Sequence, residues 1–284
     1  MRIVKSASLM QKIALEHIKN GDEIGLVPTM GALHDGHASL IARSEKNDDI
    51  TIVSIFVNPT QFGPKEDYLK YPRTVKEDLE ICKENHVDYV FMPSVNDMFP
   101  AEHKTFIEVK ILQDILCGKF RQDHFRGVVT VVAKLFNISC ADRSYFGMKD
   151  FQQLKIVERM VKDLNFKIKI IPCPIIREKS GLAISSRNSY LSAKEKKSSE
   201  NISRILREAS EDFKTKNLSF VKRSALNKLK KIPGSKIDYA EIVNFSDLSF
   251  ADKNTEKAVF AVAIWIGKTR LIDNFVMLKQ TQNI

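Results

Sequence analysis

The chain has 284 residues and a hydrophobic content of 43%, enough for one large globular domain or two smaller ones. Its apolar runs are much shorter than the ~20 residues of a membrane helix, and residues 1–21 lack the uninterrupted apolar core of a secretory signal, so we expect a cytoplasmic protein without a membrane span. A net charge of +10 indicates anionic partners, but no base-stacking aromatic array accompanies the lysines, which argues against nucleic acid.

Strand-like and helix-like patterns alternate along the first part of the chain. Strands are predicted at 23–28, 49–57, 87–93, 143–147 and 166–172, and helices at 36–46, 74–86, 127–139 and 150–164. This alternation implies parallel strands joined by right-handed crossovers. We therefore predict an α/β fold with a Rossmann-like, doubly wound parallel sheet, whose ligands lie outside the carboxyl ends of the strands.

The pattern changes after residue 175. Lys/Glu/Ser-rich helices are predicted within 193–231, and strands at 235–245, 257–267 and 269–278. We expect a nucleotide- and substrate-binding domain over 1–175 and a smaller α+β domain over 176–284 that acts as a lid. The four cysteines have no Cys-x-x-Cys spacing, so neither a disulfide framework nor a zinc site is expected.

The segment VPTMGALHDGHASLI, residues 27–41, places His34 and His37 around a glycine between a predicted strand and a predicted helix. Glycine lets a ligand approach the backbone, and a helix start offers unpaired N–H groups and a partial positive charge. An isolated histidine pair more commonly stabilises a turn, and no further metal ligands stand at convincing spacing. In this strand–turn–helix context, the pair is typical of a site for triphosphate oxygens.

Two later segments have side chains suited to the same anion. Ser185–Asn188 (SSRN) offers hydroxyls and a guanidinium on a loop that could close over a nucleotide, although alone it also fits an ordinary polar hinge. Lys149 is predicted at the carboxyl edge of the sheet, and Asp150 either caps the next helix or accepts from a ligand hydroxyl. Of Gln152 and Gln153 in the first helical turn, one could face the cleft.

The loops around 56–74 and 121–129 carry further polar side chains. The amides of Asn58 and Gln61 suit a small polar substrate because they bind carboxylates and hydroxyls without adding charge, although loop amides are also common on ordinary surfaces. Arg121, His124 and Arg126 could line an anionic site or decorate the start of the following helix.

Taken together and in order, these motifs resemble the pantoate–β-alanine ligase family, the pantothenate synthetases. The resemblance rests on PTMGALHDGH, NPTQFG, YPRT, HFRGV, YFGMKDFQQL and ISSRNSYLS, which span residues 28–192. It implies ATP-dependent condensation of pantoate with β-alanine through a pantoyl adenylate, with release of pyrophosphate and AMP. It also implies Mg²⁺ as a cofactor and a homodimer.

The resemblance assigns roles to residues of this chain. Catalytic roles fall to His34, His37 and Lys149, with His37 as proton donor, and pantoate or β-alanine contacts to Asn58, Gln61 and Gln153. ATP contacts fall to Met30, Gly31, Ala32, Leu33, His34, Asp35, Gly36, His37, Gly147, Met148, Lys149, Asp150, Ile176, Ile184, Ser185, Ser186 and Arg187. Glu77 and Asp78 stand where the family has an acidic pair near the metal, and the metal ligands stay unassigned.

Two positions depart from the family pattern. Met148 replaces a common glutamate, which alters the charge beside the phosphates, and Gln122–Asp123 replace a frequent Pro-Gly, which changes the stiffness of that loop. Two alternative functions stay open: another nucleotidyltransferase or an aminoacyl-tRNA synthetase relative, and a basic RNA-binding protein. The combination of Asn58, Gln61 and Gln153 favours the ligase over the first, and salt-dependent RNA binding without AMP release would favour the second.

Overall fold

The structure is a computed structural model that describes residues 1–64 and 66–280. The chain forms two compact units, called here the N-terminal unit and the C-terminal unit. The N-terminal unit comprises Met1–Met148 and Ile156–Pro174, and the C-terminal unit comprises Lys149–Lys155 and Ile175–Ile284. Within the described residues, no helix combines the length and the apolar character needed to cross a membrane.

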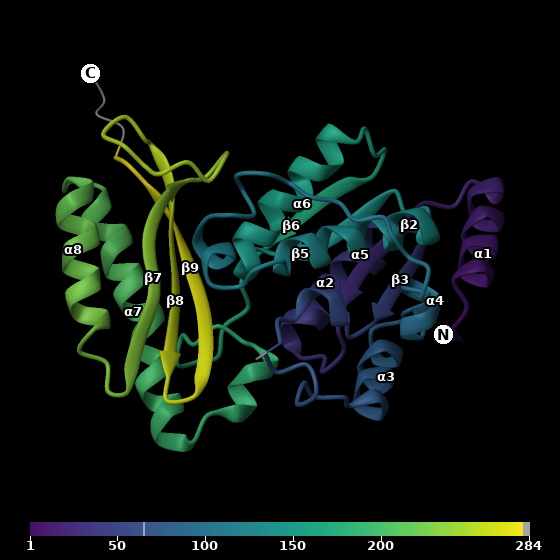
Figure 1. Ribbon diagram of the computed structural model, residues 1–284, viewed down its shortest axis with the longest axis horizontal. Helices are drawn as coiled ribbons and strands as arrows, with labels where there is room; N and C mark the ends of the chain where they lie inside the picture. Colours follow the sequence, from purple (N-terminus) through teal and green to yellow (C-terminus); the bar gives the residue numbers. More distant parts are fainter. Residues whose placement is uncertain (65, 281–284) are drawn as a thin grey trace. The chain divides into compact units, whose positions relative to one another are not determined.

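The N-terminal unit is built on a six-stranded parallel sheet, which confirms the predicted fold class. In spatial order the strands are β1 (Arg2–Val4), β4 (Tyr89–Phe91), β3 (Ile50–Ile55), β2 (Ile24–Thr29), β5 (Arg143–Gly147) and β6 (Lys169–Cys173). The order reverses at β2, because β3 and β4 extend to one side and β5 and β6 to the other (Figure 1). Doubly wound sheets bind ligands at the carboxyl ends of the strands beside such a reversal.

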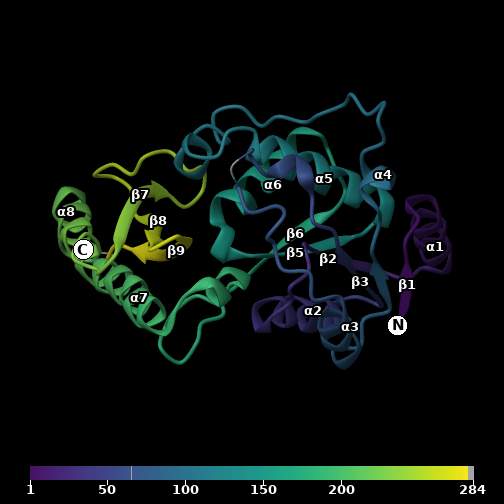
Figure 2. The same ribbon diagram turned by 60° about the horizontal axis from the view of Figure 1, so that its bottom comes forward.

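Helices cover both faces of this sheet. They are α1 (Ala7–Asn20), α2 (Asp35–Asn47), α3 (Val75–Glu84), α4 (Val95–Met98), α5 (His124–Ser139) and α6 (Phe151–Asp163), of which residues 156–163 belong to this unit, with the 3₁₀ helices η1 (Pro59–Gln61) and η2 (Leu116–Lys119). A further 3₁₀ helix, η3 (Met148–Asp150), begins at the last residue of the unit's first segment. Figure 2 shows α2 and α3 on one face and α5 on the other. The central strand β2 is therefore almost wholly buried, which explains its continuous apolar sequence.

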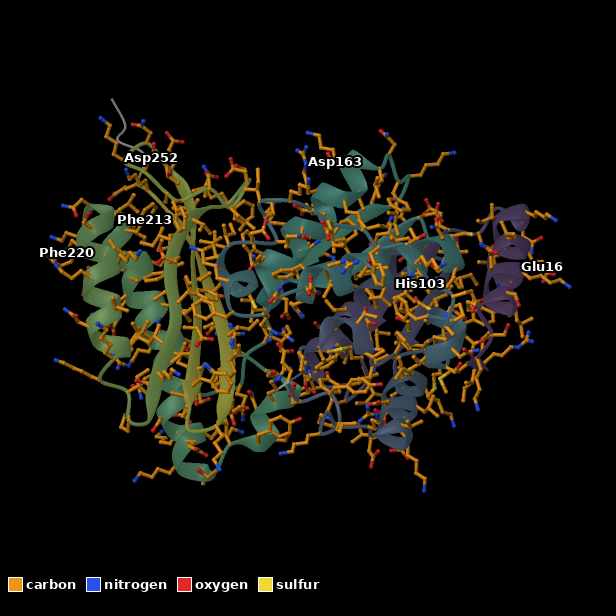
Figure 3. The ribbon with its side chains drawn as sticks, viewed as in Figure 1. Glu16, His103, Asp163, Phe213, Phe220 and Asp252 are labelled. Carbon is orange, nitrogen blue, oxygen red and sulfur yellow. The ribbon has the colours of Figure 1, made fainter. Side chains whose placement is uncertain are left out.

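Helix α1 is not among the predicted elements. Its apolar pattern is interrupted by Lys12, Glu16 and Lys19, which the structure places on the exposed side of an amphipathic helix. Glu16 projects outward from α1 in Figure 3, whereas Met10 and Ile13 are buried. The charged residues thus mark the outer side of the helix, and they do not break it.

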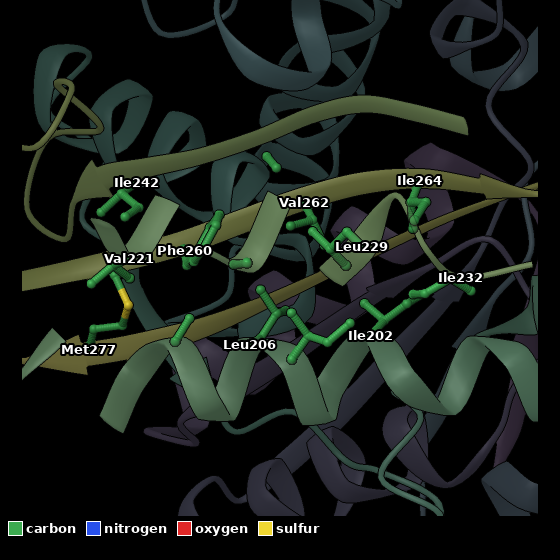
Figure 4. Close-up of a cluster of buried hydrophobic side chains, with 14 of the residues drawn as sticks. Ile202, Leu206, Val221, Leu229, Ile232, Ile242, Phe260, Val262, Ile264 and Met277 are labelled. Carbon is green, nitrogen blue, oxygen red and sulfur yellow. The ribbon is translucent and has the colours of Figure 1, made fainter. Parts of the chain in front are cut away.

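The C-terminal unit is an antiparallel sheet packed against two helices, as predicted for an α+β domain. The sheet has the order β7 (Ser235–Asn244), β8 (Lys257–Ile266), β9 (Thr269–Leu278), and the helices are α7 (Ala193–Phe213) and α8 (Leu218–Leu229), with η4 (Ser186–Tyr190) before them. Figure 4 shows Ile202 and Leu206 of α7 in one apolar cluster with Val262 of β8. Phe213 is fully buried in this cluster, whereas Phe220 lies on the outer side of α8 (Figure 3).

Candidate active site

A tight turn follows β2 at the point where the strand order reverses. Its backbone is left-handed at Gly31, with φ of 78°, and at Ala32, with φ of 50°. A Cβ atom at Gly31 would lie 2.9 Å from Oδ2 of Asp78 and 3.1 Å from Cγ2 of Ile55, so glycine is needed both for its conformation and for space. The amide of Gly31 donates to Oγ1 of Thr29 over 3.1 Å, which ties the turn to the strand.

Asp78, in the first turn of helix α3, holds the turn that follows β2 through hydrogen bonds to its backbone. Its carboxylate accepts hydrogen bonds from the amides of Ala32 (3.1 Å) and Leu33 (2.8 Å), and from Oγ1 of Thr74 (3.1 Å). The Asp78 side chain is buried and the neighbouring Glu77 is exposed, so the two carboxylates point to different surroundings. This geometry does not support Glu77 and Asp78 as a metal-binding pair, because both oxygens of Asp78 are occupied by protein donors.

His34 and His37 are fixed at the start of α2 by a reciprocal cap. Nδ1 of His34 accepts from the amide of Gly36 over 3.2 Å, and the amide of His34 donates to Nδ1 of His37 over 3.3 Å. The two rings lie 4.1 Å apart between centroids. Because both Nδ1 atoms accept, each neutral ring carries its proton on Nε2. The pair therefore stabilises the turn and also presents two N–H donors beside a helix N-terminus.

The loop after β3 brings Gln61 to the same turn. Nε2 of Gln61 lies 3.0 Å from Sδ of Met30, the first residue after β2. Asn58 is fully buried, and its Nδ2 donates to Oε1 of Gln61 and to the carbonyl of Gly127, each over 3.1 Å. Its Oδ1 accepts from the amide and the hydroxyl of Thr60, at 3.2 and 2.8 Å. Asn58 thus uses its side-chain amide to bind neighbouring residues of the loop and of α5, and its bond to Oε1 orients Gln61.

Helix α5 approaches this loop backbone to backbone. A Cβ atom at Gly127 would lie 2.3 Å from the carbonyl oxygen of Thr60, so only glycine fits there. At the start of the helix, Nδ1 of His124 lies 2.8 Å from the carbonyl oxygen of Gln61. Arg121 donates to the same carbonyl over 3.4 Å and forms a two-point ion pair with Glu66. Arg121 and His124 thus hold the backbone of Gln61.

The departure at Gln122–Asp123 has a backbone consequence. Asp123 precedes α5 with φ of 59° and ψ of −2°, a left-handed conformation. The family pattern commonly has glycine here, which adopts this conformation without strain. Aspartate tolerates it better than most residues, so the loop keeps its path at a modest cost in stability.

In the C-terminal unit, Lys149 and Asp150 precede α6. Nζ of Lys149 lies 3.5 Å from Oδ2 of Asp150, and the Lys149 side chain is 20% exposed. Gln152 is buried and Gln153 is partly exposed, so Gln153 is the more accessible of the two amides. This is the glutamine for which substrate contact is expected.

Of the other residues expected to contact ATP, Gly147 ends β5 and Met148 begins η3, whereas Ile176 and residues 184–187 lie on one turn and one 3₁₀ helix of the C-terminal unit. The amide of Ile184 donates to the carbonyl of Ile176 over 3.0 Å, which pairs the two ends of the turn. Oγ of Ser185 accepts from the amide of Arg187 over 3.3 Å and so caps η4. Nδ2 of Asn188 donates to the carbonyl of Ala183 over 3.0 Å. These bonds set the direction in which the SSRN segment leaves the turn.

The structure therefore brings several predicted residues into contact within the N-terminal unit, whereas in the C-terminal unit the contacts described above are local to residues 149–150 and 176–188. In the N-terminal unit, residues 30–37, Asn58 and Gln61 form one continuous site at the carboxyl ends of β2 and β3. The sequence does not indicate that Asp78 supports the turn of this site. Its sequence signal, an acidic residue in the first turn of a predicted helix, is shared by many helices and does not reveal a partner 46 residues earlier.

Comparisons with known proteins agree along the whole chain. The sequence model of the family described as pantoate-beta-alanine ligase matches residues 2–276. A curated pantothenate synthetase of Endomicrobium trichonymphae is 79% identical over 279 residues, covering 98% of this chain and 99% of that protein. Another, from Sulfurihydrogenibium sp., is 50% identical and covers 96% of this chain and 99% of that protein.

Solved structures give the same result. A crystal structure of pantothenate synthetase from Thermus thermophilus has a TM-score of 0.91 at 37% identity, covering 97% of this chain and 99% of that chain. A pantoate-beta-alanine ligase from Francisella tularensis, complexed with beta-gamma ATP and beta-alanine, has a TM-score of 0.80 at 38% identity, and the match covers 97% of both chains.

Proposed function

Because this chain belongs to the pantoate–β-alanine ligase family, we propose that it joins pantoate to β-alanine at the expense of ATP, through a pantoyl adenylate. One observation carries the assignment of the site to this reaction. The turn 30–37, with its two Nε2–H donors and helix N-terminus, directly adjoins the amide of Gln61 at the reversal of the strand order. An anion site is thus placed beside a neutral group suited to a hydroxy acid.

The chemistry requires two displacements. A pantoate carboxylate oxygen attacks the α-phosphorus of ATP, and the bond from that phosphorus to the bridging oxygen breaks, releasing pyrophosphate. The amine of β-alanine then attacks the acyl carbon, the amine gives up a proton, and AMP leaves as an amide forms. A free carboxylate is a poor electrophile, so adenylation supplies the leaving group that the second step needs.

Each proposed role follows from charge and geometry. His34 and His37 donate Nε2–H to phosphate oxygens, with His37 as proton donor, and Lys149 balances the charge that develops on the phosphates. Gln61 and Gln153 bind pantoate, and Gln61 also adjoins β-alanine. Asn58 acts by holding Gln61. The remaining ATP contacts are assigned to residues 30–37, 147–150, Ile176 and 184–187.

Mg²⁺ is proposed to arrive with the nucleotide. Among residues 1–64 and 66–280, no group of three or more histidine, cysteine or acidic side chains could hold a metal ion. This is compatible with a Mg²⁺ ion whose ligands are mainly polyphosphate oxygens of the nucleotide, as is usual at nucleotide-binding sites. When bound, it neutralises the polyphosphate and assists departure of pyrophosphate.

We further propose that residues of both units contact ATP, with residues 176–284 serving as a lid over a substrate-binding domain of residues 1–175. A homodimer is proposed from the family alone. The proposed reaction depends neither on the lid nor on the homodimer.

A substrate-omission experiment tests the function. The protein is incubated with ATP and Mg²⁺, with and without pantoate and β-alanine, while pyrophosphate, AMP and amide are measured. We expect pyrophosphate release to need pantoate, and AMP release with amide formation to need β-alanine as well. Adenylation of other acids but not of pantoate would contradict the proposal, as would RNA binding without AMP release.

A further inference from the structure

Two adjacent residues of β9 contact both segments of the C-terminal unit for which ATP contacts are proposed. Nδ2 of Asn274 donates to the backbone carbonyl of Lys149 over 2.9 Å. The carboxylate of Asp273 accepts from both terminal nitrogens of Arg177, at 2.8 and 2.9 Å. Asp273 is 5% exposed and Asn274 is 4% exposed, so both side chains are shielded from solvent and loss of a partner is costly for them.

Arg177 extends this pair into the turn that precedes the SSRN segment. Its guanidinium also donates to the carbonyl of Gly181 over 3.1 Å and to the carbonyl of Asn274 over 3.2 Å. Arg177 pairs with Ala183 in an isolated β-bridge. Gly181 has φ of 92° at the tip of the turn. One planar side chain therefore joins both sides of the turn to β9.

We propose that Asp273 and Asn274 are positioning residues for ATP, a role that rests on the proposed function. Asn274 sets the backbone at Lys149, and Asp273, through Arg177, sets the turn between Ile176 and Ile184. Both residues lie on one strand that is paired with β8 along its whole length. The strand thus fixes the spacing between the lysine and the serine-bearing segment.

A positioning residue affects the rate because it sets the distance between a catalytic group and the reacting atoms. Displacing a group that stabilises the transition state by about 1 Å lowers a rate by roughly 100-fold. We therefore expect Asn274→Ala and Asp273→Asn each to raise the KM for ATP about tenfold, and to slow pantoate-dependent pyrophosphate release by roughly 10- to 100-fold. The KM for pantoate stays within about twofold.

Asp238→Asn is the matched control. Asp238 lies on β7 of the same sheet, is paired with Arg270 over 2.8 Å, and accepts from Nε1 of Trp265 over 2.9 Å. It has the same chemistry as Asp273, but none of these contacts involves Lys149 or the turn 176–184. If Asp273→Asn and Asn274→Ala alter the ATP parameters no more than Asp238→Asn does at a similar loss of thermal stability, the positioning role is wrong.

A double-variant cycle separates positioning from general destabilisation. Lys149→Met keeps the backbone carbonyl but removes the ammonium group. We expect the effect of Asn274→Ala on pyrophosphate release to be much smaller in the Lys149→Met background, because the group that it positions is already missing. Equal fold-changes in the two backgrounds would overturn the proposal.

Wild-type protein run in parallel separates this inference from the proposed function. If the wild type releases no pyrophosphate with pantoate, the proposed function fails, and calorimetric titration with ATP then tests the positioning role by affinity alone. Weaker ATP binding by both β9 variants than by Asp238→Asn supports the role. Equal binding contradicts it.

Discussion

The buried amide of Asn58 donates to Oε1 of Gln61 over 3.1 Å, so the side chain proposed to bind pantoate is itself oriented by a neighbour. The bond leaves Gln61 with a defined direction for its own Nε2 group, beside Met30. In the proposed site, recognition of pantoate therefore depends on Gln61, which contacts the acid, and on Asn58, which holds Gln61 in place.

Gln61→Ala is expected to raise the KM for pantoate by roughly 10- to 100-fold while changing the KM for ATP by less than about threefold, because the lost hydrogen bonds are to the acid. Initial rates with each substrate varied in turn measure the split. Equal changes in both KM values would remove Gln61 as an acid contact.

Asn58→Ala is also expected to raise the KM for pantoate more than the KM for ATP. In addition, it is expected to lower the free energy of unfolding. Removing this amide leaves the carbonyl of Gly127 and the Thr60 groups without their partner, which costs about 1–3 kcal/mol. Urea unfolding measures this cost. A variant that is destabilised but keeps a normal pantoate KM would show that Asn58 does not orient Gln61.

His37→Ala and Lys149→Ala are expected to lower pantoate-dependent pyrophosphate release by roughly 100- to 1,000-fold, because each removes a group aimed at developing charge. The unfolding midpoint of Lys149→Ala is expected to stay close to that of the wild type, whereas His37→Ala also loses its half of the α2 cap, at a cost of about 0.5–2 kcal/mol. His86→Asn is the matched control, since His86 is an exposed histidine whose left-handed φ of 56° suits asparagine. Near-normal turnover in both variants would defeat the charge-stabilising role.

Asp123→Gly is expected to stabilise the protein by about 0.5–1 kcal/mol, because glycine adopts the left-handed conformation before α5 without strain. The gain is limited by the greater backbone freedom of glycine in the unfolded chain. Denaturant unfolding checks it, and Asp123→Asn controls for removal of the carboxylate charge, because asparagine also tolerates the left-handed conformation. A loss of stability would mean that the Asp123 side chain makes a favourable contact.

Alkaline conditions are expected to destabilise the fold through Cys82. Burial, with a smaller contribution from the charge of Asp78, raises the pKa of Cys82 from 9.0 to about 12. Between these values the unfolded chain has released the thiol proton and the folded chain retains it, so the free energy of unfolding falls as pH rises, by up to about 1.4 kcal/mol per pH unit. Urea titrations at pH 8, 9 and 10 measure the slope. Cys82→Ala is expected to reduce it, and an unchanged slope would show that Cys82 does not titrate in this way.

The periodicity of the sequence is enough to predict the buried strands. It does not predict the side chains that hold the site residues in place. Strand β2 has a continuous apolar sequence because helices cover both its faces, and that pattern depends on local composition. The bonds from Asp78 to the turn at 32–33 depend on how α3 packs, as do the bonds from β9 to Lys149 and Arg177. Contacts between distant residues leave no periodic signal, so these side chains look like ordinary acidic or amide residues.

Gly127 also constrains what this loop can become. No side chain fits between Gly127 and the carbonyl of Thr60, so at this point α5 and the loop meet main chain to main chain. The spacing between α5 and the backbone of Gln61 is therefore set by the main chain, and the side chains of Asn58 and His124 bridge the two. Even one methyl group at residue 127 would force the main chain at Thr60 and Gln61 to shift, and the Gln61 side chain would move with it.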